Sequence, residues 1–198
     1  MTVQSSLFDH HERRRLGDGA WIDVRPGWLT DQLSDALLRE LTEDVEWRAE
    51  RRQMYDRVVD VPRLVSFHDL ATEPPPHPMI EELRARLSDT YAADLGEPFT
   101  TAGLCLYRDG GDSVAWHGDK IGRSRSEDTV VAIVSLGATR VFALRPRGGG
   151  PSLRLPQGHG DLLVMGGSCQ RTWEHSVPKT AKPTGPRISI QYRPRGVR

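Results

Sequence analysis

Hydrophobic positions recur at helical spacing in two stretches of the first half of the chain. Leu33, Leu37 and Leu41 follow one another four residues apart, and Thr30 stands before them as a candidate N-cap. The second stretch begins at Pro78, and proline suits the first turn of a helix. Its apolar face comprises Ile80, Leu83, Leu87 and Tyr91. The spacing predicts one helix from 31 to about 44 and another from 78 to about 91.

The rest of the first half lacks this periodicity. Residues 1–20 are polar, charged and contain glycine, which indicates a loose leader. Residues 47–70 mix charged residues with β-branched and aromatic ones and indicate strand and loop, interrupted at Pro62. We therefore expect residues 21–98 to form a helical cap that also contributes to substrate recognition.

After residue 99 the pattern changes to short apolar segments separated by Gly, Pro and Asp. The candidate strands are residues 103–108, 129–136, 140–144, 153–155, 162–165, 172–177 and 187–193. Closely spaced short strands without intervening helical spacing are typical of a sandwich or barrel. We expect a single domain over residues 1–198, of α+β class but mainly β, with its β core at 99–195.

The composition narrows the class of protein further. A hydrophobic content of 37% is enough for a packed core. The longest apolar run, residues 130–136, falls far short of the ~20 residues that cross a bilayer, and the N-terminal residues lack the apolar stretch of a secretory signal. With two cysteines, Cys105 and Cys169, a disulfide scaffold is excluded. These features predict a cytoplasmic protein that has no membrane partner.

The formal net charge of zero combines two halves of opposite sign. Residues 1–98 hold 12 Arg, no Lys and 20 acidic residues, which gives −8. Residues 99–198 hold 12 Arg, 3 Lys and 7 acidic residues, which gives +8. The basic half favours an anionic partner such as nucleic acid or a charged metabolite. The alternative is that the two halves fold together and neutralise each other.

The tripeptide His-Gly-Asp occurs twice, at 117–119 and at 159–161. Residues i and i+2 of an extended segment project to the same side, so each copy can direct an imidazole and a carboxylate at one ion. The second copy leads directly into the apolar run 162–165, and its acid is predicted to cap a turn. The first copy, His117 and Asp119, is predicted to lie at a strand end that opens toward solvent.

A further histidine, His175, could complete a metal site with the first tripeptide. Four candidate strands separate it from His117, enough for the chain to circle a small barrel and return to the same mouth. Two His and one carboxylate on one face of the ion form the site of non-haem Fe(II) oxygenases. Zinc with Cys105 and Cys169 as additional ligands is the competing interpretation, although neither cysteine stands in a C-x-x-C pairing.

Residues 187–193 alternate between polar and apolar side chains. The polar face holds Arg187, Ser189, Gln191 and Arg193, and the core-facing side holds Ile188, Ile190 and Tyr192. Buried arginines need anionic partners. A dicarboxylate inside the barrel would satisfy them, because Arg binds carboxylate in a bidentate manner. The alternative is a strand face in contact with solvent.

The order H-x-D, a distant His and then R-x5-R resembles the AlkB family of Fe(II)- and 2-oxoglutarate-dependent dioxygenases. The likeness extends through residues 106–110, 134–137, 160–165 and 173–179, and more weakly through Pro62-Arg63-Leu64. It is strong over about residues 99–193. The resemblance implies a double-stranded β-helix, a relative of the jelly roll, with N-terminal helices that buttress it.

The resemblance also implies roles for individual residues. It assigns Fe(II), with O2 as co-substrate, to His117, Asp119 and His175. It assigns Arg187 to the distal carboxylate of 2-oxoglutarate, and Arg193 to a catalytic supporting role near the cosubstrate and the iron carboxylate. The hydroxyl of Tyr107 would donate to 2-oxoglutarate.

Three positions depart from the family pattern. Cys105 and Ser189 stand where the family commonly has Asn, which reroutes hydrogen bonds to the cosubstrate without removing the charge pairing. Ile121 stands where the bacterial founding member carries an acid that helps to read the base.

The implied activity is oxidative demethylation of N-alkylated nucleobases in nucleic acid, with a monomer acting in repair of alkylated DNA. A base in a duplex would be flipped out and held between aromatic or apolar side chains. Candidates for contact with the substrate are Met54, Tyr55, Arg63, Phe67, Trp116 and Arg147. Two alternatives remain: the same oxidation of a protein side chain or small molecule, and a non-catalytic binding module.

Overall fold

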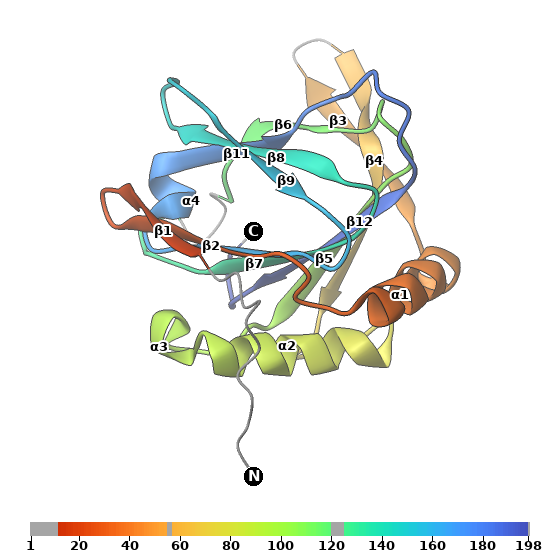
Figure 1. Ribbon diagram of the computed structural model, residues 1–198, viewed down its shortest axis with the longest axis horizontal. Coiled ribbons are helices and arrows are strands. Elements are labelled where there is room, and N and C mark those ends of the chain that lie inside the picture. The colour runs from red at the N-terminus through yellow and green to blue at the C-terminus, as the bar shows by residue number, and fades with distance from the viewer. Residues whose placement is uncertain (1–11, 55–56, 120–124, 198) are drawn as a thin grey trace.

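The computed structural model describes residues 12–54, 57–119 and 125–197, and it consists of two antiparallel sheets that face each other (Figure 1). The larger sheet has the order β1 (Glu12–Gly17), β2 (Ala20–Arg25), β10 (Leu162–Gly166), β7 (Val131–Gly137), β12 (Arg187–Arg193), β5 (Thr101–Tyr107), β4 (Arg57–Asp69) and β3 (Arg48–Met54). The smaller sheet has the order β6 (Val114–His117), β11 (Trp173–Val177), β8 (Arg140–Pro146) and β9 (Leu153–Gln157).

Helices cover the face of the larger sheet that points away from the smaller one (Figure 1). They are α1 (Asp31–Asp44), α2 (Pro78–Thr90) and the short α3 (Ala92–Leu95), whereas α4 (Cys169–Thr172) lies in the connection from β10 to β11. This arrangement confirms the predicted mainly β, jelly-roll-like double-stranded β-helix with helical buttresses. No described helix is both long and apolar enough to cross a bilayer.

The two predicted helices are confirmed, together with the reasons for them. The Thr30 side chain accepts a hydrogen bond from the Leu33 amide at the start of α1, and Leu37 and Leu41 are buried. Pro78 opens α2, and the four apolar residues predicted on its inner face are all buried. The apolar side of β12 packs into this same layer, between the larger sheet and the helices.

The N-terminal segment differs from the prediction. Residues 12–17, expected in a loose leader, form β1, and β2 then pairs with β10 inside the larger sheet. Ala20 and Ile22 are buried between the sheets, whereas Trp21 packs on the helix side, because successive side chains of a strand point to opposite faces. Since β3 and β4 also belong to this sheet, residues 21–98 are not a separate helical cap.

Pro62 does not interrupt the strand that contains it. β3 pairs with β4 through a bulge: Ala49 lies opposite Leu64, whereas Arg51 lies opposite Asp60. Pro62 falls within this irregular interval, where a missing N–H breaks no regular ladder bond. Strand β4 therefore continues through the proline.

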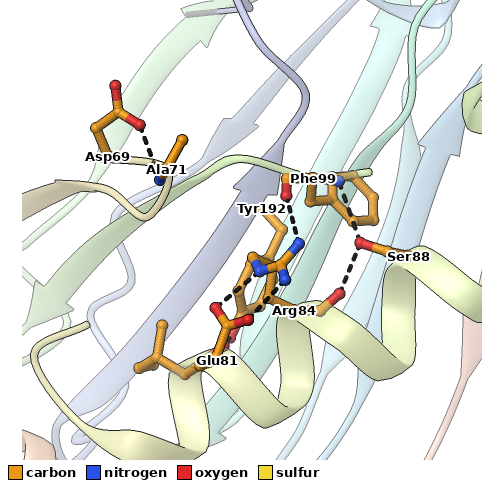
Figure 2. Close-up of polar contacts among 8 residues, drawn as sticks. Asp69, Ala71, Glu81, Arg84, Ser88, Phe99 and Tyr192 are labelled. Carbon is orange, nitrogen blue, oxygen red and sulfur yellow. Dashed lines mark hydrogen bonds and ion pairs between the residues drawn. The ribbon is translucent and has the colours of Figure 1, made fainter. Parts of the chain in front are cut away.

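Hydrogen bonds of buried and half-buried residues hold helix α2 against the larger sheet (Figure 2). Nη1 of Arg84 donates to the Phe99 carbonyl at 2.9 Å, and Oγ of Ser88 accepts from the Phe99 amide at 3.1 Å. The Tyr192 hydroxyl donates to the Ile80 carbonyl at 3.1 Å. These bonds connect the helix to the start of β5 and to β12, which carries the predicted arginine pair.

The substitution Ser88→Ala should lower the free energy of unfolding by about 1–3 kcal/mol, because the buried Phe99 amide loses its acceptor. Urea denaturation followed by circular dichroism measures this change. Thr90→Ala is the matched control, since the Thr90 hydroxyl also donates to a helix carbonyl but is exposed. Equal effects of the two substitutions would contradict the role given to Ser88.

Candidate active site

The pairing of β6 with β11 brings the two ends of the predicted metal site together. His117 lies directly opposite His175, whereas Val114 lies opposite Val177. Three steps along β6 thus match two along β11, which is a bulge. Because the bulge breaks the alternation of side chains, both Val114 and His117 line the pocket between the two sheets.

Asp119 completes a group of three candidate ligands just beyond the end of β6. The ligand atoms of His117, Asp119 and His175 all lie within 4.8 Å of one another. The two imidazole centroids are 4.2 Å apart, and the Phe142 ring stacks on His175 at 5.2 Å. Neither cysteine belongs to this group, so the described residues do not form the four-ligand zinc site considered above.

Both histidines are held in a form that can donate a lone pair. Nδ1 of His117 lies 2.8 Å from the Ala115 carbonyl, which can only accept, so Nδ1 carries the proton and Nε2 is left as the ligand atom. Burial lowers the pKa of His117, and it lowers the pKa of His175 to about 3. Both rings are therefore neutral near pH 7.

The carboxyl group of Asp119 is held ionised in a buried place. Burial alone would raise its pKa, but the Arg193 guanidinium outweighs burial, together with the two imidazoles, which are protonated only at low pH, and the pKa falls to about 2. Nε of Arg193 donates to Oδ2 of Asp119 at 2.7 Å. This contact places Arg193 beside the carboxylate of the candidate metal site.

The turn α4 supports the loop that carries Asp119. The buried Gln170 side chain accepts from the Asp119 amide at 3.1 Å. Arg147 donates to the carbonyl oxygens of Gln170 at 3.2 Å and Arg171 at 2.7 Å. A Cβ atom on Gly118 would lie 3.0 Å from both the Gln170 carbonyl and the Arg147 guanidinium. Glycine at position 118 therefore allows the loop to approach α4. Arg147, which was predicted to contact substrate, stabilises this turn through its two hydrogen bonds.

The second His-Gly-Asp copy has the structural role predicted for it. Oδ2 of Asp161 accepts from the Gly158 amide at 2.6 Å, and Oδ1 accepts from the Gly27 amide at 2.9 Å. Nδ1 of His159 accepts from the Gly137 amide at 2.8 Å. The side chains of this copy thus stabilise turns and lie outside the pocket.

Strand β12 supplies the opposite wall of the pocket, with the predicted alternation. Its four polar side chains line the pocket: Arg187, Ser189, Gln191 and Arg193. Arg187 is 1% exposed, and Nη2 donates to the Ser135 hydroxyl at 2.7 Å. Its Nε and Nη1 have no hydrogen-bond partner in the described part of the chain. Buried unpaired donors are costly, so this guanidinium is suited to an anionic ligand.

Tyr107 lies beside Arg187, whose guanidinium carbon is 5.2 Å from the centre of the tyrosine ring. Burial raises the pKa of Tyr107 to about 12, helped by the neighbouring Cys105. The hydroxyl therefore keeps its proton near neutral pH and can donate to an anion. Burial also lowers the pKa of Arg187.

Arg63, a candidate for contact with the substrate, lines the pocket. Its Nε donates to Sγ of Cys105 at 3.4 Å, and Nη1 reaches the Ser113 carbonyl at 3.5 Å. Both Arg63 and Cys105 line the pocket. Cys105 therefore occupies the predicted cosubstrate region, and both cysteines of the chain are free thiols.

The other predicted substrate residues are not gathered at the pocket. Phe67 on β4 is 48% exposed and does not line it. Trp116 does not line it either, since it precedes the pocket-facing His117 on β6 and neighbouring residues of a strand point to opposite faces; the Arg145 guanidinium lies 4.2 Å from its ring centre. Tyr55 and Ile121 lie outside the described residues, as does the side chain of Met54.

Four residues of the site were not assigned by the sequence: Ser135, Phe142, Gln170 and Gln191. Gln191 could have been found, because it shares the polar face of β12 with both arginines. Ser135 lies in a segment that resembles the family. For Gln170 the sequence gives no signal, since its contact depends on how α4 folds back onto the loop that carries Asp119.

Known proteins resemble this chain in sequence and in fold. The family model of the 2OG-Fe(II) oxygenase superfamily matches residues 22–193. A solved prolyl hydroxylase from Trichoplax adhaerens, in complex with a hypoxia inducible factor oxygen degradation domain peptide fragment, has a TM-score of 0.64 at 13% identity. The match covers 87% of this chain and 82% of that one, and it supports the fold alone.

Two human proteins are similar in sequence. "Alpha-ketoglutarate-dependent dioxygenase alkB homolog 3" is 31% identical over 190 residues, which cover 85% of this chain and 64% of that protein. This chain therefore spans less than two thirds of that relative's length. "DNA oxidative demethylase ALKBH2" is 30% identical over 182 residues, which cover 81% of this chain and 68% of that protein. The chain belongs to the 2OG-Fe(II) oxygenase superfamily and, within it, to the AlkB family.

Proposed function

We propose that this chain is an Fe(II)- and 2-oxoglutarate-dependent dioxygenase that removes N-linked alkyl groups from nucleobases in DNA. The observation that carries the proposal is the pairing of two features in one pocket. Three side chains that could bind a metal converge at one wall, and in the opposite wall lies the buried Arg187, whose Nε and Nη1 have no hydrogen-bond partner among the described residues.

The residues fit the two groups that the superfamily uses. His117 and His175 offer neutral nitrogens and Asp119 a charged oxygen, the donor set that suits Fe(II) with open positions left for ligands. Arg187 would hold the distal carboxylate of 2-oxoglutarate, with Tyr107 as a neighbouring donor. When bound, iron with 2-oxoglutarate and dioxygen supplies the oxidation, which yields succinate, carbon dioxide and, from an N-methyl group, formaldehyde.

The protein's own groups prepare the site for this chemistry. Arg193 fixes the orientation of the Asp119 carboxylate and keeps it charged. Ser135 holds one nitrogen of Arg187, so that the rest of the guanidinium faces the pocket with little freedom to turn. Phe142 covers one face of His175 and excludes water from that side.

The choice of DNA as substrate rests on three kinds of support. One relative is named a DNA oxidative demethylase. Residues 99–198 carry a formal charge of +8, which favours a polyanion. Phe67 is the exposed large hydrophobic residue of the described chain, and an exposed aromatic ring on β4 could stack on a flipped base.

His117→Ala should abolish the formation of both succinate and formaldehyde from N-methylated oligonucleotides after anaerobic loading with Fe(II), because one of three ligands is lost. His159→Ala is the matched control from the second tripeptide and should retain most of the turnover. Product analysis by mass spectrometry measures both variants. The opposite pattern would place the metal at the second tripeptide.

Arg187→Lys should weaken binding of 2-oxoglutarate by about 10–100-fold, because lysine keeps the charge but loses the bidentate fork. Anaerobic isothermal titration of the Fe(II)-loaded protein with 2-oxoglutarate measures the dissociation constant. Arg154→Lys, at an exposed position on β9, is the control and should leave binding unchanged. Unchanged affinity in Arg187→Lys would rule out this residue as the carboxylate anchor.

Retention of DNA should fall steeply with salt. If three phosphates are neutralised, affinity for a single-stranded oligonucleotide should drop roughly 20-fold between 50 and 200 mM salt. Fluorescence anisotropy with a labelled oligonucleotide measures this slope. A salt-independent signal, or the absence of binding at 50 mM salt, would favour a protein side chain or a small molecule as the substrate.

A further inference from the structure

Gln191 occupies a position between two polar neighbours on the pocket face of β12. Its Nε2 donates to the Ser189 hydroxyl at 2.5 Å, and its Oε1 accepts from Nη2 of Arg193 at 3.2 Å. A guanidinium can only donate, so the amide oxygen must face Arg193 and the amide nitrogen must face Ser189. The neighbouring charge thus fixes which way the amide points.

This orientation decides what the Ser189 hydroxyl can do. A serine hydroxyl has one proton to donate, and here its oxygen already accepts from Gln191. The proton must therefore point away from the amide. Ser189 is 2% exposed and lines the same pocket as Tyr107 and Arg187, and Nε and Nη1 of Arg187 have no hydrogen-bond partner among the described residues.

The strand next to β12 leaves room for this arrangement. Gly103 on β5 lies directly opposite Gln191. A Cβ atom at Gly103 would lie 3.2 Å from Nη1 of Arg193 and 3.5 Å from Oε1 of Gln191. The absence of a side chain there allows the amide and the guanidinium to lie side by side across β5.

We propose that Gln191 is a positioning residue, which turns the Ser189 hydroxyl into a hydrogen-bond donor for 2-oxoglutarate and is itself held in place by Arg193. The inference rests on the proposed function of the site. The family commonly has an asparagine, which carries N–H donors of its own, at the position of Ser189. Here Gln191 sets the direction in which the serine hydroxyl donates. It also connects the cosubstrate wall to the metal carboxylate, because Arg193 bonds both Gln191 and Asp119.

A double-mutant cycle tests the proposal by anaerobic isothermal titration of Fe(II)-loaded protein with 2-oxoglutarate. Ser189→Ala should weaken binding about 10-fold, the effect of losing a hydrogen bond to a charged group. Gln191→Met, which keeps length but not hydrogen bonding, should weaken binding about 3–10-fold. The double variant should bind within about twofold of Ser189→Ala alone, since Gln191 acts through the serine. Gln32→Met on the exposed face of α1 is the matched control and should bind as the unmodified protein does.

Gln191→Glu provides a second variant, with a different chemical outcome. A carboxylate still accepts from Arg193, but it draws the Ser189 proton toward itself, so binding of 2-oxoglutarate should weaken at least as much as in Gln191→Met. In steady-state assays of Gln191→Met, KM for 2-oxoglutarate should rise while kcat at saturation changes less than about twofold.

Two results would overturn this inference. One is an affinity of Gln191→Met within twofold of the unmodified protein, and the other is independent, additive effects of the two substitutions. If the unmodified protein bound no 2-oxoglutarate, the proposed function itself would fail, and that outcome is distinct from either result.

Discussion

The register between β6 and β11 is the constraint on which the site depends. One extra residue in β6 sets His117 opposite His175 and directs both Val114 and His117 into the space between the sheets. A shift of one residue would turn the ligands to the other face of the sheet. Everything else at this end of the pocket, including the loop to Asp119 and the turn α4 behind it, follows from that pairing.

The two arginines of the pocket differ in their hydrogen-bond partners. Arg193 is satisfied within the protein by Asp119 and Gln191, so its charge serves to hold a carboxylate and an amide in place. Arg187 donates to the Ser135 hydroxyl, and its Nε and Nη1 have no hydrogen-bond partner among the residues that the structure describes. The two arginines are six residues apart on one face of β12. Arg193 therefore contacts the carboxylate of the candidate metal site, while Arg187 keeps donors that suit an anionic ligand.

Local signals predicted much of this from the sequence. The helices follow from apolar residues four apart, and β12 follows from strict alternation, which also identified the arginine pair. The context of the two tripeptides distinguished His117 from His159. Long-range contacts were not accessible in this way. The place of β2 in the sheet depends on its pairing with β10, and continuation of β4 through Pro62 depends on a bulge in its partner strand.

The location of β3 has a consequence for how such proteins diverge. β3 is the terminal strand of the larger sheet and is bonded to β4 alone, whereas the strands that carry the two candidate histidine ligands belong to the other sheet (Figure 1). Exchanges in β3 therefore leave the pairing of β6 with β11 untouched, whereas β4 bonds Ser113 just before β6 and carries Arg63 of the pocket. A family with this architecture can vary its outermost strand while it preserves the strand pairing that brings the candidate ligands together.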